Sequence, residues 1–477
     1  MTKKNKTKIV CTIGPKTEDV PSISRLIEAG MTMARLNGSH NNLDWHIAVI
    51  KRIREVDPYL PILFDLPGRK IRTSQSNKNL AFDKQDQVVF TTDQRYSGFN
   101  KVVINYEKLH LDLKAGDTLL ADDGTLKFTV LEIRGVDIFC QADVSGVLKP
   151  AKGINVPYIK MSAPLVSEKD SARIEMCKEQ GVDFVGVSFV DSGEQLQEVY
   201  KQLSGSSIEV IAKVENQFGL DNLDSIVQNA FGILIDRGDL GAETKISNIP
   251  LMQKKIIKTA NKYGKPVIVA TEMLHTMIDN PFPTNSEVND IANAVLDGAS
   301  ALMLSGETAV GDYPFEACRL MQEVALVTEE SLNSNGGFDF EIENNTSDVV
   351  AKCINLACAS LDITKIISVT YSGFSARMIS LYRPKQSILV VTDTVEKCRQ
   401  LNLLWGVQAS VSDFLFTPTD ANNTKDALKN LYKKGVLVSK DTVIITAVRY
   451  PNPKVNTTMN FFEIHRIQDM TEIFSWD

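Results

Sequence analysis

The feature that most constrains the fold is a regular alternation of short apolar runs and helical patterns across residues 8–311. Eight of these runs are β-prone, and they cover residues 9–13, 33–36, 62–66, 184–189, 210–214, 232–235, 267–270 and 301–304. Nearly continuous apolar runs are typical of parallel strands that are buried on both faces. Eight successive β/α units predict a closed (β/α)8 TIM barrel, an α/β fold whose functional side chains gather at the carboxyl ends of the strands.

Helix signals lie between the runs. The helical patterns at residues 20–30 and 289–298 both end at a glycine, Gly30 and Gly298, as many helices do. Ser167 is followed by acidic residues, which is typical of an N-cap and the first turn of a helix. These signals support helices between the predicted strands.

Two further units accompany the barrel. Residues 74–156 change to short alternating runs with turn residues between them, which predicts a small inserted β-barrel that acts as a lid. After an acidic, Asn-rich linker, a helical pattern at 349–361 is followed by β-prone runs at 366–370, 388–392 and 441–446. We therefore expect barrel segments 1–73 and 157–326, a lid at 74–156 and an open-sheet α/β domain at 345–477.

Composition excludes several classes of protein. The chain of 477 residues suits two to four domains, and 43% hydrophobic and 23% charged residues describe a globular protein. A net charge of −7 argues against nucleic acid as a partner, and no apolar run is long enough for a membrane span. Seven scattered cysteines without a C-x-x-C pair indicate neither a disulfide framework nor a zinc site. We expect a cytoplasmic protein.

Charged residues stand at the predicted strand ends. Lys213 and Glu215 close the fifth run, and Asp236, Arg237 and Asp239 follow the sixth. Taken singly, a Lys-x-Glu pair is usually a surface ion pair, and Asp239 suits a helix cap. Several strand ends carry such groups together, which favours a phosphorylated anionic substrate and a divalent cation held by carboxylates. The other polar residues at these ends are Arg35, Asn37, Ser39, His40, Asp65, Arg69, Lys70, Arg72, Thr271, Glu272, Ser305, Glu307 and Thr308.

Six motifs resemble those of the pyruvate kinase family. They are KIVCTIGP (8–15), ARLNGSH (34–40), VIAKVEN (210–216), RGDLG (237–241), ATEML (270–274) and MLSGETA (303–309). The resemblance covers the whole chain, including the lid and the last domain. It implies phosphoryl transfer from phosphoenolpyruvate to ADP, which gives pyruvate and ATP, with Mg²⁺ or Mn²⁺ as cofactor. It also implies a homotetramer.

The resemblance also implies roles for individual residues. Lys213 would contact the transferring phosphoryl group and the enolate, Arg35 the phosphate, and Thr271 with Ser305 the region that protonates the enolate. Glu215 and Asp239 would hold the metal. The remaining implied contacts are Ser188, Arg237, Gly238 and Asp239 for the substrate, and Asn37, Arg72 and Lys152 for the nucleotide.

Departures from the family pattern change some expectations. Members that bind K⁺ use Asn, Ser, Asp and Thr; Asn37, Ser39 and Asp65 remain, but Leu66 replaces Thr. Lys70 stands where those enzymes carry Glu, so we expect activity without K⁺. Three further departures place catalytic efficiency and subunit contacts in question: Asp236 for Ala, Glu272 for Gln and Asn285 for Arg.

A loop in the last domain resembles the family's effector site. Thr370, Ser372, Gly373 and Ser375 would bind a phosphate at the start of a helix, although the same residues suit an N-cap without a ligand. Tyr371 replaces the Lys of members that respond to fructose 1,6-bisphosphate, and the loop at 449–455 lacks their glycines. A sugar monophosphate or a nucleotide is therefore the expected effector. Two alternatives to an active kinase remain: a weakly active or inactive regulator that binds metabolites, and a phosphoenolpyruvate-using enzyme with another acceptor.

Overall fold

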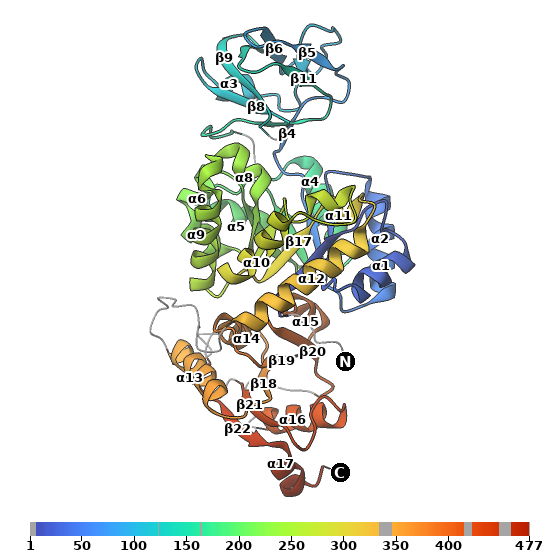
Figure 1. Ribbon diagram of the computed structural model, residues 1–477, viewed down its shortest axis with the longest axis vertical. Helices are drawn as coiled ribbons and strands as arrows, with labels where there is room; N and C mark the ends of the chain where they lie inside the picture. The colour runs from blue at the N-terminus through green and yellow to red at the C-terminus, as the bar shows by residue number, and fades with distance from the viewer. Residues whose placement is uncertain are drawn as a thin grey trace.

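The computed structural model describes residues 6–122, 124–162, 165–332, 346–414, 422–447 and 459–476. Three units are stacked along the longest axis of the molecule (Figure 1), with an all-β lid above a barrel and a sheet with helices below it. These units confirm the predicted fold class. Within the described ranges, no helix is long and apolar enough to cross a membrane.

Eight parallel strands close the barrel in the order β1-β17-β16-β15-β14-β13-β3-β2. All eight predicted runs are strands, and their ends differ from the expected ones by at most two residues. The strands are β1 (Lys8–Thr12), β2 (Met33–Asn37), β3 (Ile62–Asp65), β13 (Phe184–Val187), β14 (Glu209–Val214), β15 (Gly232–Asp236), β16 (Val267–Ala270) and β17 (Ala301–Leu304).

Helices cover the outside of the barrel. A capping box between Ser167 and Asp170 starts α4, and Gly298 ends α10 with a left-handed φ of 102°, as the sequence predicts. The helix α10 begins at Asn285 and not near residue 289, because Thr284 caps it. The helices of this unit are α1 (Val20–Glu28), α2 (Leu43–Val56), α4 (Glu168–Glu179), α5 (Gly193–Gln202), α6 (Gln217–Asp221), α7 (Leu223–Asn229), α8 (Arg237–Glu243), η1 (Ile246–Asn248), α9 (Ile249–Lys262), η2 (His275–Ile278), α10 (Asn285–Asp297), α11 (Gly306–Ala309) and α12 (Pro314–Ser331).

The lid is built from β-strands around its own apolar core, where Phe90 and Phe128 pack edge to face at 5.2 Å. Its strands form a seven-stranded sheet in the order β4-β12-β8-β9-β10-β6-β7 and a separate β11-β5 pair. The first and last strands of the insertion, β4 and β12, pair with each other and connect the lid to the barrel. The elements are β4 (Ile71–Arg72), β5 (Leu80–Phe82), β6 (Gln87–Thr91), β7 (Val102–Val103), α3 (Leu109–Asp112), β8 (Thr118–Ala121), β9 (Leu126–Arg134), β10 (Asp137–Ala142), β11 (Gly146–Leu148) and β12 (Gly153–Asn155).

The last unit has a five-stranded sheet in the order β20-β19-β18-β21-β22. The three predicted strands form its centre, whereas β20 and the antiparallel edge strand β22 were not predicted. The expected linker at 333–345 and the loop at 449–455 lie outside the described residues. The elements are α13 (Thr346–Ser360), β18 (Lys365–Val369), α14 (Phe374–Leu381), β19 (Ser387–Thr392), α15 (Val395–Leu401), β20 (Val407–Val411), α16 (Asn423–Lys433), β21 (Thr442–Thr446), β22 (Glu463–Arg466) and α17 (Ile467–Phe474).

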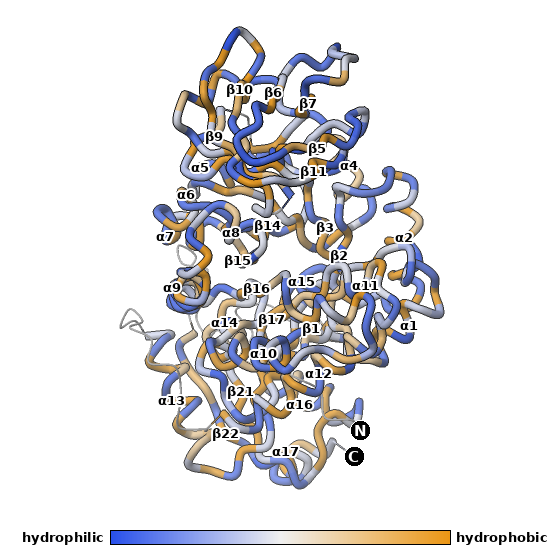
Figure 2. The backbone as a smooth tube through the Cα atoms, turned by 45° about the horizontal axis from the view of Figure 1, so that its top comes forward, coloured by the Kyte–Doolittle hydropathy of each residue, from blue (hydrophilic) through white to orange (hydrophobic). Residues whose placement is uncertain are grey.

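The apolar layer inside the barrel determines where its polar residues point. Ile211 on β14 and Leu234 on β15 belong to this layer, which is fully buried. Side chains two residues apart on a strand point to the same side. Lys213 and Asp236 therefore stand above the apolar layer, at the carboxyl ends of their strands. Figure 2 shows hydrophobic segments concentrated along the strands of the barrel.

Candidate active site

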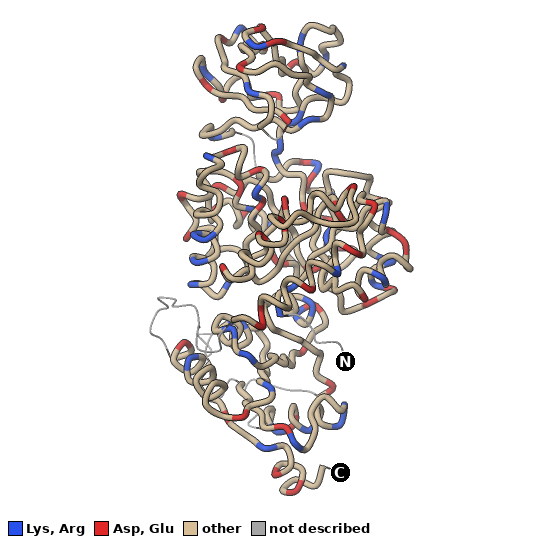
Figure 3. The backbone as a smooth tube through the Cα atoms, viewed as in Figure 1, with Lys and Arg blue, Asp and Glu red and all other residues tan. Residues whose placement is uncertain are grey.

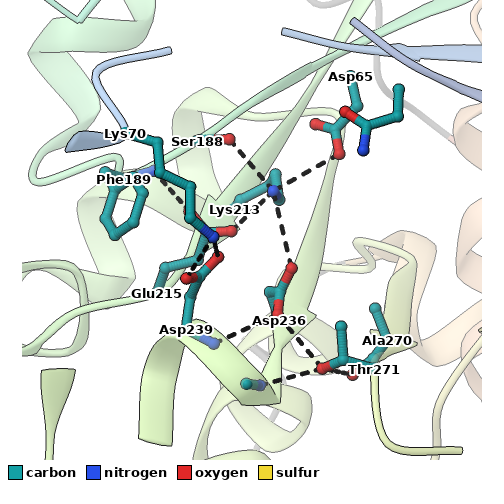
Figure 4. Close-up of polar contacts among 12 residues, drawn as sticks. Asp65, Lys70, Ser188, Phe189, Lys213, Glu215, Asp236, Asp239, Ala270 and Thr271 are labelled. Carbon is teal, nitrogen blue, oxygen red and sulfur yellow. Dashed lines mark hydrogen bonds and ion pairs between the residues drawn. The ribbon is translucent and has the colours of Figure 1, made fainter. Parts of the chain in front are cut away.

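Lys213 is the centre of the polar cluster at the barrel mouth (Figure 4). Its ammonium lies 2.7 Å from Glu215 Oε1, 3.5 Å from Asp65 Oδ2 and 3.8 Å from Asp236 Oδ2. It also donates a hydrogen bond of 3.1 Å to the hydroxyl of Ser188. Burial disfavours the charged form of Lys213, but the carboxylates of Asp65 and Glu215 outweigh it and raise the pKa of the ammonium. The group is therefore a fixed positive charge.

Three carboxylates form a candidate divalent-metal site. Oxygen atoms of Glu215, Asp236 and Asp239 all lie within 4.8 Å of one another. Carboxylate oxygens are the ligands that Mg²⁺ and Mn²⁺ prefer, so the donor set fits either ion. Burial raises the pKa of Glu215 to about 8, and burial together with Asp239 raises the pKa of Asp236. Such crowding of buried carboxylates is relieved by a cation.

The metal pair predicted from the sequence, Glu215 and Asp239, thus lies together, and Asp236 joins it as a third carboxylate. The sequence placed Asp236 near the metal but did not assign it as a ligand. Its side chain caps α8, where Oδ1 accepts a hydrogen bond of 3.4 Å from the backbone N–H of Asp239. The hydroxyl of Thr271 lies 3.2 Å from the same oxygen and accepts a hydrogen bond of 3.0 Å from the N–H of Gly238. The backbone N–H groups of Gly238 and Asp239, two implied substrate contacts, are therefore engaged by Thr271 and Asp236 respectively.

Two ion pairs border the cluster. Lys70 donates to both carboxylate oxygens of Asp239, at 2.7 and 2.8 Å. Burial disfavours its charge, but Asp239 outweighs this effect and raises the pKa of Lys70. Arg35 donates a hydrogen bond of 2.6 Å to Asp65. Burial raises the pKa of the Asp65 carboxyl, but the positive charges of Lys213 and Arg35 outweigh burial and lower this pKa below its usual value. Lys70 therefore stays charged beside Asp239, and Asp65 stays ionised beside Arg35.

The strand β16 ends in a strained turn. Thr271 and Glu272 have positive φ values of 65° and 54°, which residues other than glycine rarely adopt. Arg237 holds this turn, because its guanidinium donates to the carbonyl oxygens of Thr271 at 2.5 Å and Glu272 at 3.1 Å. It also pairs with Asp290 on α10 at 2.5 Å. The side chain of Arg237 therefore positions Thr271.

Other predicted residues lie apart from the cluster. Arg72 and Lys152 bond within the lid, to Ala151 O at 3.2 Å and to Asp122 at 2.7 Å. Ser305 starts α11, and its N–H donates to Glu307 at 2.7 Å. The remaining pair of the expected monovalent-cation region, Asn37 and Ser39, is joined by a hydrogen bond of 3.1 Å, and Ser39 is exposed.

In the predicted effector loop, the hydroxyl of Thr370 accepts a hydrogen bond of 3.0 Å from the N–H of Gly373. The hydroxyl of Ser372 accepts a hydrogen bond of 3.3 Å from the N–H of Phe374. Ser375 is buried and its hydroxyl lies 2.8 Å from that of Ser368. The first two hydroxyls therefore shape the turn, and Ser375 packs from α14 against β18. Gly373 has a left-handed φ of 78°, which this turn requires.

Sequence reasoning missed a contact between the lid and the barrel. Asn155 on β12 donates a hydrogen bond of 2.9 Å to Glu243 on α8, and both side chains are buried. Burial raises the pKa of Glu243 to about 7. A cavity of ≈ 30 Å³ beside this bond is also lined by Lys70 and Asp191. The position of Glu243 four residues after Asp239, one helical turn away, was the available signal. Basic residues lie at the narrow connection between the lid and the barrel (Figure 3).

Comparisons with known proteins agree with this geometry. The family model for the pyruvate kinase barrel domain matches residues 4–318, and that for the pyruvate kinase alpha/beta domain matches residues 348–465. A pyruvate kinase of Bacillus licheniformis is 39% identical over 93% of this chain and 77% of its own length. One from Clostridium acetobutylicum is 36% identical over 97% of this chain and 100% of its own length. The crystal structure of a pyruvate kinase from Cryptosporidium parvum superposes with a TM-score of 0.88 at 32% identity, covering 97% of this chain and 96% of that one. The resemblance is thereby confirmed, and the chain belongs to the pyruvate kinase family.

Proposed function

We propose that the barrel mouth transfers the phosphoryl group of phosphoenolpyruvate to ADP, giving pyruvate and ATP. The observation that carries the proposal is the buried ammonium of Lys213, which Glu215 and Asp236 hold at the centre of the cluster. A protein that only binds a metabolite needs no fixed positive charge at the position of the transferring phosphoryl group. Charge builds up on the transferring group and on the enolate oxygen, so an ammonium already in place stabilises the transition state more than the substrate.

In the proposed reaction, the bond between phosphorus and the enol oxygen breaks while a terminal oxygen of ADP forms the new bond to phosphorus. Arg35 binds the phosphate, and Lys213 lies beside both the phosphoryl group and the enolate oxygen that it leaves. The enolate carbon then takes up a proton, and the hydroxyl of Thr271, with Ser305 further along the rim, orients the water that delivers it. Arg72 and Lys152 bring cations to the nucleotide phosphates when the lid closes and excludes water.

We assign Glu215, Asp236 and Asp239 as the residues that hold Mg²⁺ or Mn²⁺. A bound divalent cation supplies positive charge to the substrate oxygens at this position. Lys70 lies on Asp239 and keeps its charge, so we propose that its ammonium takes the place of K⁺ and that the enzyme works without that ion. A cytoplasmic location, a homotetramer and a phosphorylated effector at Thr370, Ser372, Gly373 and Ser375 are proposed from the family alone.

The test is an assay of pyruvate formation from phosphoenolpyruvate and ADP with Mg²⁺, in buffers with K⁺ and with tetramethylammonium in its place. We expect turnover in both buffers and its loss in Lys213→Met. Lys262→Met, which removes an exposed lysine of α9, is the matched control and should leave turnover unchanged. Phosphoenolpyruvate binding without turnover in the unaltered enzyme would instead support the metabolite-binding regulator, whose ligand binding does not need Lys213.

A further inference from the structure

A second cluster of cations lies at the opposite end of the barrel, where it meets the last domain. Figure 1 shows α14 directly below the barrel. Lys265 precedes β16, Arg377 lies on α14, and Arg383 follows that helix. All three line one hollow of ≈ 20 Å³, which also includes Ser300, Leu381 and Trp405. The hollow is at the amino ends of the barrel strands and is therefore remote from Lys213.

Two of these cations, Lys265 and Arg377, form no close ion pair with a carboxylate within the described part of the chain. Among the described residues, no carboxylate oxygen lies within 4.0 Å of a charged nitrogen of Lys265 or Arg377. Glu209 attracts both cations, but it forms its ion pair, at 3.8 Å, with Lys397. Burial, and then the charge of Arg377, lower the pKa of Lys265 to about 8. Like charges in a partly buried place cost free energy unless an anion compensates them.

Structural roles account for two of the three cations. Lys265 donates to the carbonyl oxygen of Ala230, directly after α7, at 2.5 Å and to that of Gln228, in the last turn of α7, at 3.5 Å. Arg383 donates to the carbonyl oxygens of Gly298 and Ala299, the latter at 2.9 Å, after the end of α10. Cations at helix C-termini are favourable, so the positions of Lys265 and Arg383 need no ligand.

Arg377 has no comparable role. Its guanidinium lies over the ring of Phe231, 4.4 Å from the ring centroid, and its Nε is buried without a hydrogen-bond partner in the described structure. A buried N–H without an acceptor is costly, and guanidinium groups bind phosphate through paired hydrogen bonds. Arg377 lines the hollow together with Gly264 and Lys265 of the loop before β16.

We propose that this hollow binds a phosphate-type oxyanion, either inorganic phosphate or the phosphate group of a small metabolite, with Arg377 as its principal donor and Lys265 as a second cation. Since α14 begins directly after Gly373 of the loop at 370–373, the bound anion fixes this helix to the barrel. The site is separate from both the barrel mouth and the loop, and it does not depend on the proposed reaction.

Trp405 gives the experiment a local signal, because it lines the hollow and lies 5.0 Å below the guanidinium of Arg383. The chain has three tryptophans, at 45, 405 and 476, so Trp45→Phe with Trp476→Phe leaves Trp405 as the only tryptophan, which is excited selectively over tyrosine at the red edge of the absorption band. The fluorescence of this double variant is measured while it is titrated with inorganic phosphate, and NaCl at equal ionic strength serves as the control. We expect a saturable fluorescence change with phosphate alone.

Arg377→Met in the same background should weaken phosphate binding by at least about tenfold, the loss expected for charge-assisted hydrogen bonds. Lys262→Met, an exposed cation at the end of α9, should bind phosphate as the parent does. If Arg377→Met fails to fold, Arg377→Lys keeps the charge without the paired donors and should bind phosphate with intermediate affinity. The proposal is overturned if the parent shows no saturable change, or if the variant at Arg377 binds phosphate as tightly as Lys262→Met.

Discussion

Lys70 holds both carboxylate oxygens of Asp239, a residue assigned to the metal site, at 2.7 and 2.8 Å. Lys70 comes from the chain between β3 and the lid, whereas Asp239 lies on α8. This pair therefore links the lid connection to the metal site. It also holds the ammonium that we propose as the substitute for K⁺ beside the metal site.

Replacing Lys70 by Glu should make activity dependent on K⁺. The substitution removes the ammonium and adds a carboxylate, so we expect activity without K⁺ to fall at least about tenfold, with partial rescue by K⁺. The measurement is the rate of pyruvate formation in K⁺ and in tetramethylammonium buffers. Lys16→Met breaks an exposed ion pair with Asp312 and serves as the control. An unchanged rate in both buffers would show that Lys70 does not replace the ion.

Replacing Asp236 by Ala should weaken Mn²⁺ binding to the enzyme without substrate. We expect the dissociation constant for Mn²⁺ to rise about tenfold, because one of three carboxylate ligands is lost. Binding is measured from the electron paramagnetic resonance signal of free Mn²⁺, which needs no turnover. Asp221→Ala, which removes an exposed carboxylate on α6, is the matched control. Equal Mn²⁺ affinities in the two variants would show that Asp236 is not a metal ligand and only caps α8.

The strand positions and the principal site residues were accessible from the sequence because both depend on local patterns. The apolar run before Lys213 fixes its strand, and alternation places Glu215 on the same side as Lys213 at the strand end. The partner of Lys70 was not accessible, since Asp239 lies 169 residues further along the chain and only the closed barrel brings the two together.

The edge strands of the last domain were missed for a different reason. β22 contains Glu463, His465 and Arg466, and β20 is only partly buried after Val407. Edge strands carry polar residues because one side faces solvent, and their apolar pattern is therefore weak. The contact of Asn155 with Glu243 was missed because it joins residues from two separate units.

Replacing Glu243 by Gln should make stability less dependent on pH. The folded pKa of Glu243 is raised from 4.5 to about 7, so this group stabilises the fold fully below about pH 4.5, and the contribution is lost as the pH rises towards 7. Gln keeps an oxygen for Asn155 and does not ionise. At pH 8 we expect the variant to be more stable than the parent, by an amount of order 2 kcal/mol.

Urea unfolding at pH 5 and pH 8 measures this effect. The difference between the two pH values should be smaller in Glu243→Gln than in the parent. Glu198→Gln changes an exposed carboxylate that pairs with Lys201 and should leave the difference as in the parent. The same pH difference in Glu243→Gln and the parent would contradict the raised pKa of Glu243.

Replacing Arg237 by Met should reduce both stability and catalysis. Arg237 donates to the carbonyl oxygens of Thr271 and Glu272, whose positive φ values each cost about 1–3 kcal/mol and persist only where neighbours hold them. Loss of these hydrogen bonds leaves two partly buried acceptors and the strained turn without support, so the free energy of unfolding should fall by about 2–4 kcal/mol. The turn then relaxes and moves the hydroxyl of Thr271 away from Asp236.

The kinetic result distinguishes a positioning role from general destabilisation. At a temperature where the variant remains folded, kcat should fall by at least about tenfold, because Thr271 no longer orients the protonating water. Solvent deuterium should then slow turnover more in the variant than in the parent, since proton delivery limits the rate. Arg134→Met, which removes an exposed pair with Glu132 in the lid, is the control. A destabilised variant with unchanged kcat and isotope effect would show that Arg237 supports the fold without positioning Thr271.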